Sequence, residues 1–186
     1  HLPYNRNGLK LFNADGGLEH ADITDLLETA AVLSAGQADI SKVSKVDLIS
    51  LYAQSLCEKI RLGVKADDYD RPLAGLHIVV DAGNGAGGFF VRQVLEPLGA
   101  DTAGSQFLEP DGMFPNHIPN PENKQAMDSV RAATVEHHAD MGIIFDTDVD
   151  RMSAVLHDGS EVNRDATTAM ISAIIAPDYP CATSVT

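Results

Sequence analysis

Hydrophobic residues follow a helical spacing in two stretches of the first third of the chain. Ile23 to Leu33 and Val46 to Leu62 place apolar residues every three or four positions, as amphipathic helices do. Asp22 and Ser44 stand in front of these stretches as candidate N-caps. We therefore expect two helices here, the first ending before Gly36.

Short apolar runs alternate with helical patterns in the rest of the chain. Strands are expected at Leu76 to Val80, near Thr102 to Leu108, at Met141 to Phe145 and at Met152 to Leu156. Helices are expected at Ala86 to Leu98, Asn123 to His138 and Asp165 to Ala176. Such alternation is typical of α/β domains. The prediction is a layered α/β/α domain with a mixed, mostly parallel sheet.

The charge balance limits the partners that the chain is expected to bind. Its 186 residues include 13 basic and 27 acidic side chains, a formal net charge of -14. A surface that binds nucleic acid needs a basic patch to attract phosphates, so no nucleic-acid partner is expected. A small phosphorylated ligand held at one local site is compatible with this charge.

Few features of the sequence report on the cellular compartment. The longest weakly polar run, Ala166 to Ala176, is too short to span a bilayer, and no signal peptide opens the chain. Cys57 and Cys181 form no disulfide framework, and Cys57 falls on an apolar helical face where a buried thiol is expected. These features favour an intracellular protein, with the cytoplasm preferred over an organelle and no membrane partner.

Three aspartates follow the strand expected at Met141 to Phe145. Asp146, Asp148 and Asp150 occupy alternate positions, and Arg151 comes directly after them. Carboxylates packed this closely repel one another and raise at least one pKa unless a cation is present. Mg²⁺ and Ca²⁺ prefer oxygen ligands. Ligands tend to bind at the carboxyl ends of strands in α/β sheets, which favours a metal loop over a solvated acidic turn.

Three kinds of acidic site begin with such a spacing. An EF-hand loop needs glycine at its sixth position and glutamate at its twelfth, but counting from Asp146 these positions hold Arg151 and His157. The EF-hand is therefore excluded. Two interpretations remain open: part of a two-metal or phosphoaspartate site, or a single Mg²⁺ held by all three carboxylates with the arginine contacting a phosphate nearby.

A glycine-rich segment raises a different hypothesis. Gly83, Gly85 and Gly88 fit the pattern G-x-G-x-x-G between a strand and a helix, which is the fingerprint of dinucleotide binding. Asp101 lies downstream, but it precedes its strand, whereas a ribose-binding acid follows one. In the competing interpretation the glycines form a tight turn that permits close packing. From the residues alone, a nucleotide-binding α/β module that uses Gly83 to Gly88 remains an alternative.

Several segments together resemble a known family. Residues 146–151, Asp-Thr-Asp-Val-Asp-Arg, are similar to the metal-binding loop of the α-D-phosphohexomutases, the phosphomannomutase/phosphoglucomutase superfamily. Segments 81–87 and 115–122 resemble parts of that family's second domain. The opening residues His1, Pro3, Asn7-Gly8 and Lys10 resemble the stretch that follows the family's phosphoserine. The resemblance covers nearly the whole chain in order, and it implies that the glycine segment is structural.

The resemblance also implies a domain organisation. The family has four domains, and this chain would be an internal piece. Residues 1–40 would end domain 1, residues 41–162 would form domain 2 with the metal loop, and residues 163–186 would begin domain 3. Domain 2 would thus be flanked by pieces of neighbouring similar domains. The serine that carries the phosphate would stand just before His1, so no nucleophile is expected within the chain.

The activity that the resemblance implies is phosphate transfer on a hexose. In that family a phosphoserine and a hexose 1,6-bisphosphate intermediate interconvert hexose 1-phosphate and hexose 6-phosphate. The implied cofactor is Mg²⁺, and its implied protein ligands are the carboxylates of Asp146, Asp148 and Asp150. Arg151 would contact a phosphate, and His1 and Lys10 are candidates for proton transfer and phosphate contact beside the serine. The hexose phosphates would be partners of the full-length enzyme, and the isolated piece is expected to be inactive.

Overall fold

The computed structural model describes residues 5–178 except 7, 35 and 38. The chain divides into two compact units, His1–Val46 and Asp47–Thr186. No helix within the described ranges is long and apolar enough to cross a membrane.

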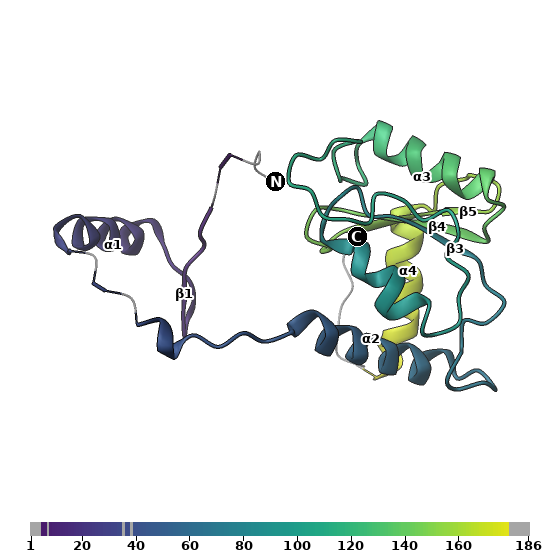
Figure 1. Ribbon diagram of the computed structural model, residues 1–186, viewed down its shortest axis with the longest axis horizontal. Helices are drawn as coiled ribbons and strands as arrows, with labels where there is room; N and C mark the ends of the chain where they lie inside the picture. Colours follow the sequence, from purple (N-terminus) through teal and green to yellow (C-terminus); the bar gives the residue numbers. More distant parts are fainter. Residues whose placement is uncertain (1–4, 7, 35, 38, 179–186) are drawn as a thin grey trace. The chain divides into compact units, whose positions relative to one another are not determined.

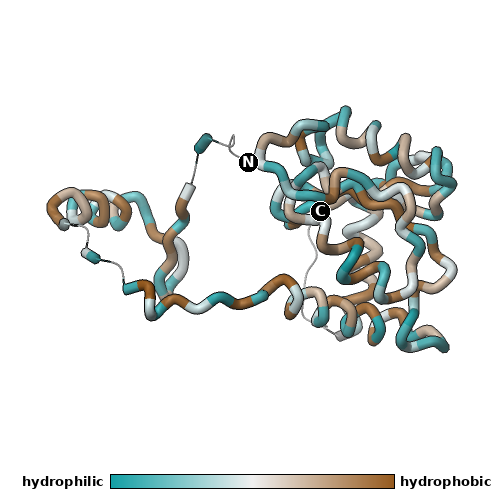
Figure 2. The backbone as a smooth tube through the Cα atoms, in the orientation of Figure 1, coloured by the Kyte–Doolittle hydropathy of each residue, from teal (hydrophilic) through white to brown (hydrophobic). Residues whose placement is uncertain are grey.

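The first unit contains a small hairpin and one helix. Strands β1 (Phe12–Asn13) and β2 (Gly16–Gly17) pair antiparallel around a turn at residues 14–15. Helix α1 (His20–Val32) and the short 3₁₀ helix η1 (Ile40–Lys42) follow. None of the 13 described residues of α1 is buried. Figure 2 shows hydrophobic positions recurring along α1. Three of them, Leu26, Leu27 and Val32, are exposed.

Helix α1 begins three residues earlier than the sequence pattern predicts. Its N-cap is Glu19, and the capping box is completed by Asp22, whose carboxylate accepts a hydrogen bond of 3.0 Å from the Glu19 amide. The prediction of Asp22 as the N-cap was wrong, because the residue acts from the third position inside the helix.

The second unit is built around a three-stranded sheet. Its strands are β3 (Ile78–Asp81), β4 (Met141–Phe145) and β5 (Met152–Leu156). β3 pairs parallel with β4, and β5 pairs antiparallel with β4. The strand expected near Thr102 to Leu108 is reduced to two parallel bridges beside β3, at Asp101 and Gln106. A tight turn between these bridges, closed by the bond from the Ser105 amide to the Thr102 carbonyl, interrupts the ladder.

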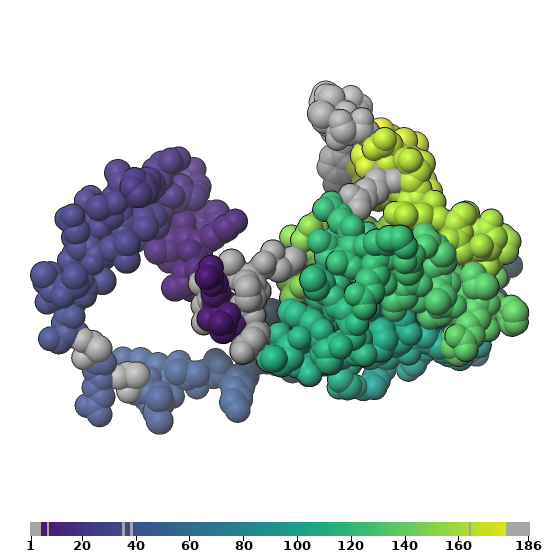
Figure 3. All heavy atoms as spheres, turned by 90° about the horizontal axis from the view of Figure 1, so that it is seen from above, coloured from purple at the N-terminus to yellow at the C-terminus, as the bar shows by residue number. Residues whose placement is uncertain are grey.

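Helices cover both faces of this sheet (Figure 1). The helices of this unit are α2 (Leu48–Val64), the 3₁₀ helix η2 (Ala86–Gly88), the π-helix η3 (Val91–Leu95), α3 (Lys124–Glu136), α4 (Arg164–Ile175) and the 3₁₀ helix η4 (Ala176–Asp178). Met127 and Val130 of α3 pack on one face, against Ile144 and Val155. In Figure 3 the loop before α3 and α3 itself, teal to green, form one continuous surface.

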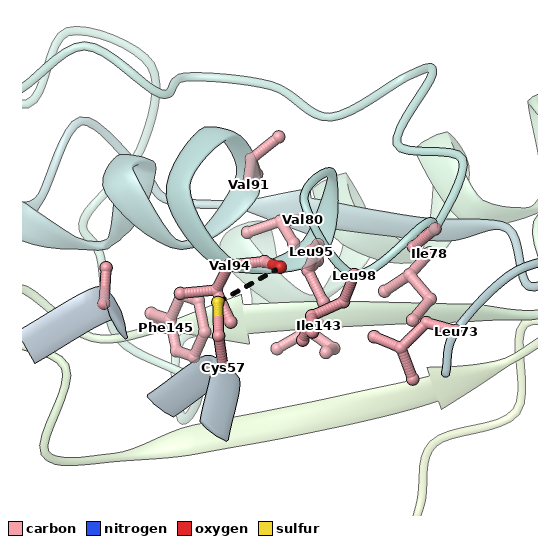
Figure 4. Packing of buried hydrophobic residues seen from close by; sticks show 12 residues of the cluster. Cys57, Leu73, Ile78, Val80, Val91, Val94, Leu95, Leu98, Ile143 and Phe145 are labelled. Atoms are coloured by element: carbon pink, nitrogen blue, oxygen red, sulfur yellow. Dashed lines mark hydrogen bonds between the residues drawn. The ribbon is translucent and has the colours of Figure 1, made fainter. Parts of the chain in front are cut away.

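The other face carries the main core, which joins β3 and β4 to η3 and α2. Val80, Ile143 and Phe145 from the strands meet Val94 from η3 and Cys57 from α2, as Figure 4 shows. Cys57 is a buried free thiol, as the sequence predicts, and its Sγ lies 3.9 Å from the Val94 carbonyl oxygen. Helices on both faces of a mixed sheet confirm the α/β/α prediction.

Two local predictions in this unit need correction. The helix expected from Ala86 to Leu98 is present but is not a regular α-helix, because it begins as the 3₁₀ helix η2 and ends as the π-helix η3 at Leu95. Helix α2 is capped by Asp47, whose Oδ1 accepts a 3.1 Å bond from the Ser50 amide, and not by Ser44. Cys181 lies outside the described residues.

Candidate metal centre

The aspartate loop connects β4 to β5 and is closed by bonds between its two ends. The Asp146 amide donates to the Arg151 carbonyl at 3.1 Å, and the Arg151 amide donates to Asp146 Oδ1 at 3.1 Å. Val149 adopts a left-handed conformation with φ of 67°, which turns the chain back. The loop is therefore a compact turn that bends its three aspartates toward one another.

The three predicted metal ligands lie together in this loop. One carboxylate oxygen from each of Asp146, Asp148 and Asp150 lies within 4.8 Å of the others, and Asp146 is buried while the other two are exposed. Oxygen atoms at this separation are a suitable donor set for a hard divalent cation. The donor chemistry of the loop therefore fits a metal ion.

Arg151 balances part of the negative charge. Its Nε donates to Asp146 Oδ2 at 2.8 Å and lies 3.6 Å from Asp150 Oδ1. Burial alone would raise the pKa of Asp146, but hydrogen bonds from Arg151 and with Asp150 lower it overall. A hydrogen bond with Asp146, burial and the charges of Asp146 and Asp148 raise the pKa of Asp150. The contribution of the Asp146 and Asp148 charges to the raised pKa of Asp150 is the repulsion expected from the aspartate spacing.

The backbone amides of residues 83–86 in the glycine segment are engaged within the protein. Gly83 donates to Asp81 Oδ1 at 2.9 Å and Asn84 to the Phe107 carbonyl at 2.8 Å. Gly85 donates to the Ala82 carbonyl at 2.7 Å, and the Ala86 amide donates to the Thr147 carbonyl of the aspartate loop at 2.9 Å. Phosphate cradles of this type need such amides to point at the ligand, so the geometry favours the structural interpretation of the glycines.

A buried carboxylate outside the predicted site organises the neighbouring loop. Asp81, the last residue of β3, is fully buried, and its Oδ1 is hydrogen-bonded to His117 Nε2 at 3.0 Å. Gln106 Nε2 and Ser129 Oγ each donate to its Oδ2 at 2.8 Å. Burial disfavours the charged imidazole, but the bond and charge of Asp81 prevail and raise the pKa of His117. The sequence alone assigns Asp81 and His117 no chemical role, because no local pattern links them.

Glu122, which the sequence also did not single out, lies near Arg151. A small cavity of about 140 Å³ is lined by Asn120, Pro121, Glu122, Arg151 and Met152. The pKa of Arg151 is raised, first by its bond to Asp146 and in smaller part by the charge of Glu122. The segment around Glu122 thus borders the arginine and the metal loop.

The predicted residues at the start of the chain belong to the other unit. His1 lies outside the described residues. Lys10 is exposed and precedes β1. The structure thus brings together Asp146, Asp148, Asp150 and Arg151, while the assignments of His1 and Lys10 stay predictions.

Comparison with known proteins supplies independent information on this fold. Residues 51–159 match the family model described as phosphoglucomutase/phosphomannomutase, alpha/beta/alpha domain II. The crystal structure of a phosphoglucomutase/phosphomannomutase family protein from Burkholderia thailandensis superposes with a TM-score of 0.66 at 22% identity, covering 91% of this chain and 41% of that one. At this identity the structural likeness supports the fold alone.

Curated relatives share more of the sequence. A phosphomannomutase/phosphoglucomutase of Pseudomonas putida is 33% identical over 165 residues, which cover 89% of this chain and 33% of the relative. A phosphoglucomutase of Neisseria meningitidis serogroup B is 32% identical over 168 residues, which cover 89% of this chain and 34% of the relative. The chain therefore spans about a third of the length of these relatives.

Proposed function

Because the chain belongs to the phosphoglucomutase/phosphomannomutase family, we propose that it is part of a Mg²⁺-dependent phosphohexomutase. The complete enzyme interconverts hexose 1-phosphate and hexose 6-phosphate through a phosphoserine and a hexose 1,6-bisphosphate. The names of the relatives support this type of activity. The observation that carries the proposal is the cluster of three carboxylates at the end of β4, inside the region that matches the family's domain II.

The three clustered carboxylates are the proposed metal ligands. Asp146 is held by Arg151, whereas Asp148 and Asp150 are exposed to an incoming cation. When bound, Mg²⁺ would neutralise negative charge on the phosphoryl group that is being transferred. The loop holds the three side chains close together before the metal arrives, which limits the ordering needed on binding.

Arg151 is the proposed phosphate contact. Its bond from Nε to Asp146 holds the guanidinium at the edge of the carboxylate cluster. A guanidinium is planar and carries several N–H donors, which match the geometry of phosphate oxygens. Its positive charge would attract a phosphate that the surrounding carboxylates alone would repel.

The remaining assignments follow the family pattern. Residues 1–40 would end domain 1, residues 41–162 would form domain 2, and residues 163–186 would begin domain 3. The nucleophilic serine would stand just before His1 in the intact enzyme. His1 and Lys10 would serve proton transfer and phosphate contact beside it. The 186 residues alone would then lack turnover, because the serine and the later sugar-binding domains belong to other parts of the enzyme.

The proposal is tested by the turnover of the intact enzyme. Primed with the 1,6-bisphosphate, it should convert glucose 1-phosphate or mannose 1-phosphate to the 6-phosphate, and Asp148→Asn should abolish most of this turnover. Asp158→Asn, an exposed carboxylate in the turn after β5, is the matched control and should leave it intact. Unchanged turnover in Asp148→Asn would show that the metal assignment is wrong.

Calorimetry on the 186-residue chain separates this proposal from nucleotide binding at Gly83 to Gly88. Titration with Mg²⁺ should release or absorb heat that Asp148→Asn removes. Titration with NAD should show no saturable binding. Tight NAD binding would overturn the proposal. Measurable mutase turnover by the isolated chain would overturn the inference that this chain is only a part of the active enzyme.

A further inference from the structure

Two loops meet at the carboxyl ends of the parallel strands β3 and β4. The loop after β3 holds the glycine turn, and the loop after β4 holds the three aspartates. They are joined by one hydrogen bond, in which the Ala86 amide donates to the Thr147 carbonyl at 2.9 Å. Thr147 stands between Asp146 and Asp148, so this bond holds the segment that carries two of the three carboxylates.

Gly85 makes this contact possible through its lack of a side chain. A Cβ placed on Gly85 would lie 2.9 Å from the Thr147 carbonyl oxygen and 3.1 Å from Thr147 Cα. Both distances are shorter than ordinary van der Waals contact, and both atoms belong to backbone that cannot rotate away. The backbone of Gly85, with φ of -84° and ψ of -163°, suits any residue, so the requirement is for space alone.

The other end of the turn is anchored to buried groups. Gly83, with φ of 53°, donates to Asp81 Oδ1, and a Cβ there would lie 2.8 Å from Pro119 Cβ. Asp81 is in turn fixed by the buried His117. Gly87 packs against Phe145, the last residue of β4, where an added Cβ would lie 2.7 Å from the ring. The turn is thus fixed at both ends and in contact with the metal loop between them.

We propose that the turn formed by residues 83–86 is a brace that positions the metal loop, with Gly85 as its positioning residue. The brace is a matter of geometry, but its consequence for metal binding rests on the proposed function. A side chain at position 85 would push Thr147 outward and move Asp146 and Asp148 relative to each other. The loop would keep its three carboxylates and lose their spacing.

The test compares Gly85→Ala with Gly112→Ala in the 186-residue chain. Gly112 is a loop glycine of the same unit with no atom within 4 Å of an added Cβ and no left-handed φ, so it is a matched control. NMR amide signals of residues 147–151 should shift in Gly85→Ala and stay in place in Gly112→Ala. Calorimetry should show about a tenfold or greater loss of Mg²⁺ affinity in Gly85→Ala alone, the size typical of groups that orient metal ligands.

A second variant guards against a Gly85→Ala protein that does not fold. Ala86→Pro removes the amide that donates to Thr147, at the first position of η2 where proline is tolerated and after a residue that is already extended. It should reproduce the signal shifts and the loss of affinity. In the wild-type chain, exchange of the Ala86 amide should be slow and should slow further when Mg²⁺ is added.

The outcomes separate the brace from the proposed function. Shifted loop signals with weakened Mg²⁺ binding support the brace. Unshifted signals in both variants, rapid exchange of the Ala86 amide, or shifted signals with wild-type affinity overturn it. If the wild-type chain binds no Mg²⁺ while the variants still shift the loop signals, the brace stands and the metal assignment fails.

Discussion

Asp81 and Asp146 lie at the carboxyl ends of neighbouring parallel strands, and both side chains are fully buried. Asp81 faces the donors of His117, Gln106 and Ser129. Asp146 faces one guanidinium and two further carboxylates. The protein thus surrounds the Asp81 carboxylate with hydrogen-bond donors and leaves the Asp146 carboxylate in a cluster with excess negative charge.

The difference teaches how a structural carboxylate is distinguished from a ligand. Burial is the same for both, so burial does not decide the role. The charges and hydrogen-bond donors of the neighbouring residues decide the role. A buried carboxylate that the protein pairs with donors stabilises the fold, whereas a carboxylate in a cluster with excess negative charge needs a cation from the solvent. Removal of the Asp81 carboxylate and removal of an exposed carboxylate from the Asp146 cluster should therefore have opposite consequences for stability.

The largest effect is expected at Asp81. Asp81→Ala would remove the acceptor that four donors share, one of them the ring of the buried His117, so the free energy of unfolding should fall by about 3–5 kcal/mol. Urea denaturation measures this loss. Asp158→Asn, which changes an exposed turn carboxylate, should lose about 1 kcal/mol or less. Equal losses in the two variants would remove the contrast between the strand ends.

Addition of Mg²⁺ should have the next largest effect, and it acts on the other strand end. At 100 times its dissociation constant, a metal that binds only the folded chain adds about 2.7 kcal/mol to the free energy of unfolding. Thermal denaturation with Mg²⁺ and then with excess EDTA measures the gain and its reversal. Asp81→Asn should still respond to Mg²⁺, whereas Asp148→Asn should not. A response that survives in Asp148→Asn would place the metal elsewhere.

Much of the sheet could be predicted from the sequence. Met141 to Phe145 and Met152 to Leu156 form strands with the expected bounds, because short apolar runs between turn residues have few other stable conformations. The strand near Thr102 to Leu108 was overestimated. Its residues suit a strand, but the turn from Thr102 to Ser105 leaves only two bridges beside β3.

The candidate site was predictable in its residues but not in its contacts. Alternate aspartates after a buried strand indicate a cluster, yet the 4.8 Å separation depends on the left-handed Val149 and on the closure of the loop by Arg151. Asp81 and His117 are 36 residues apart, and only the packing of their loop on β3 brings them together. The contact of Gly85 with Thr147 is likewise tertiary.

The pH dependence of stability should report on the Asp81 end. The pKa of His117 is raised above its ordinary value of about 6.5 by its bond to Asp81. A raised pKa in the folded chain means that the stabilisation is fully present below pH of about 6.5 and is lost as the pH rises through the raised pKa. The slope of the free energy of unfolding against pH cannot exceed about 1.4 kcal/mol per pH unit for one proton.

Urea denaturation of the wild type and of His117→Gln across this pH range measures the effect. The wild type should lose stability above pH of about 6.5, and the variant should lack that part of the decline. His157→Gln, an exposed histidine in the turn after β5, is the control and should follow the wild type. A wild-type profile that is retained in His117→Gln would mean that folding does not shift the pKa of His117.

The smallest effect, and the one with the opposite sign, is expected for Asp148→Asn without metal. Removing one exposed carboxylate relieves its repulsion with Asp146 and Asp150, so the melting temperature in EDTA should rise by about 1–2 °C. The same variant should lose the gain that Mg²⁺ provides, so the wild type becomes the more stable of the two once the metal is added. The melting temperature of Asp128→Asn, which breaks ion pairs with Lys124 and Arg131, should not rise in EDTA. A fall in the melting temperature of Asp148→Asn would mean that the protein already satisfies this carboxylate, and the contrast between the two strand ends would disappear.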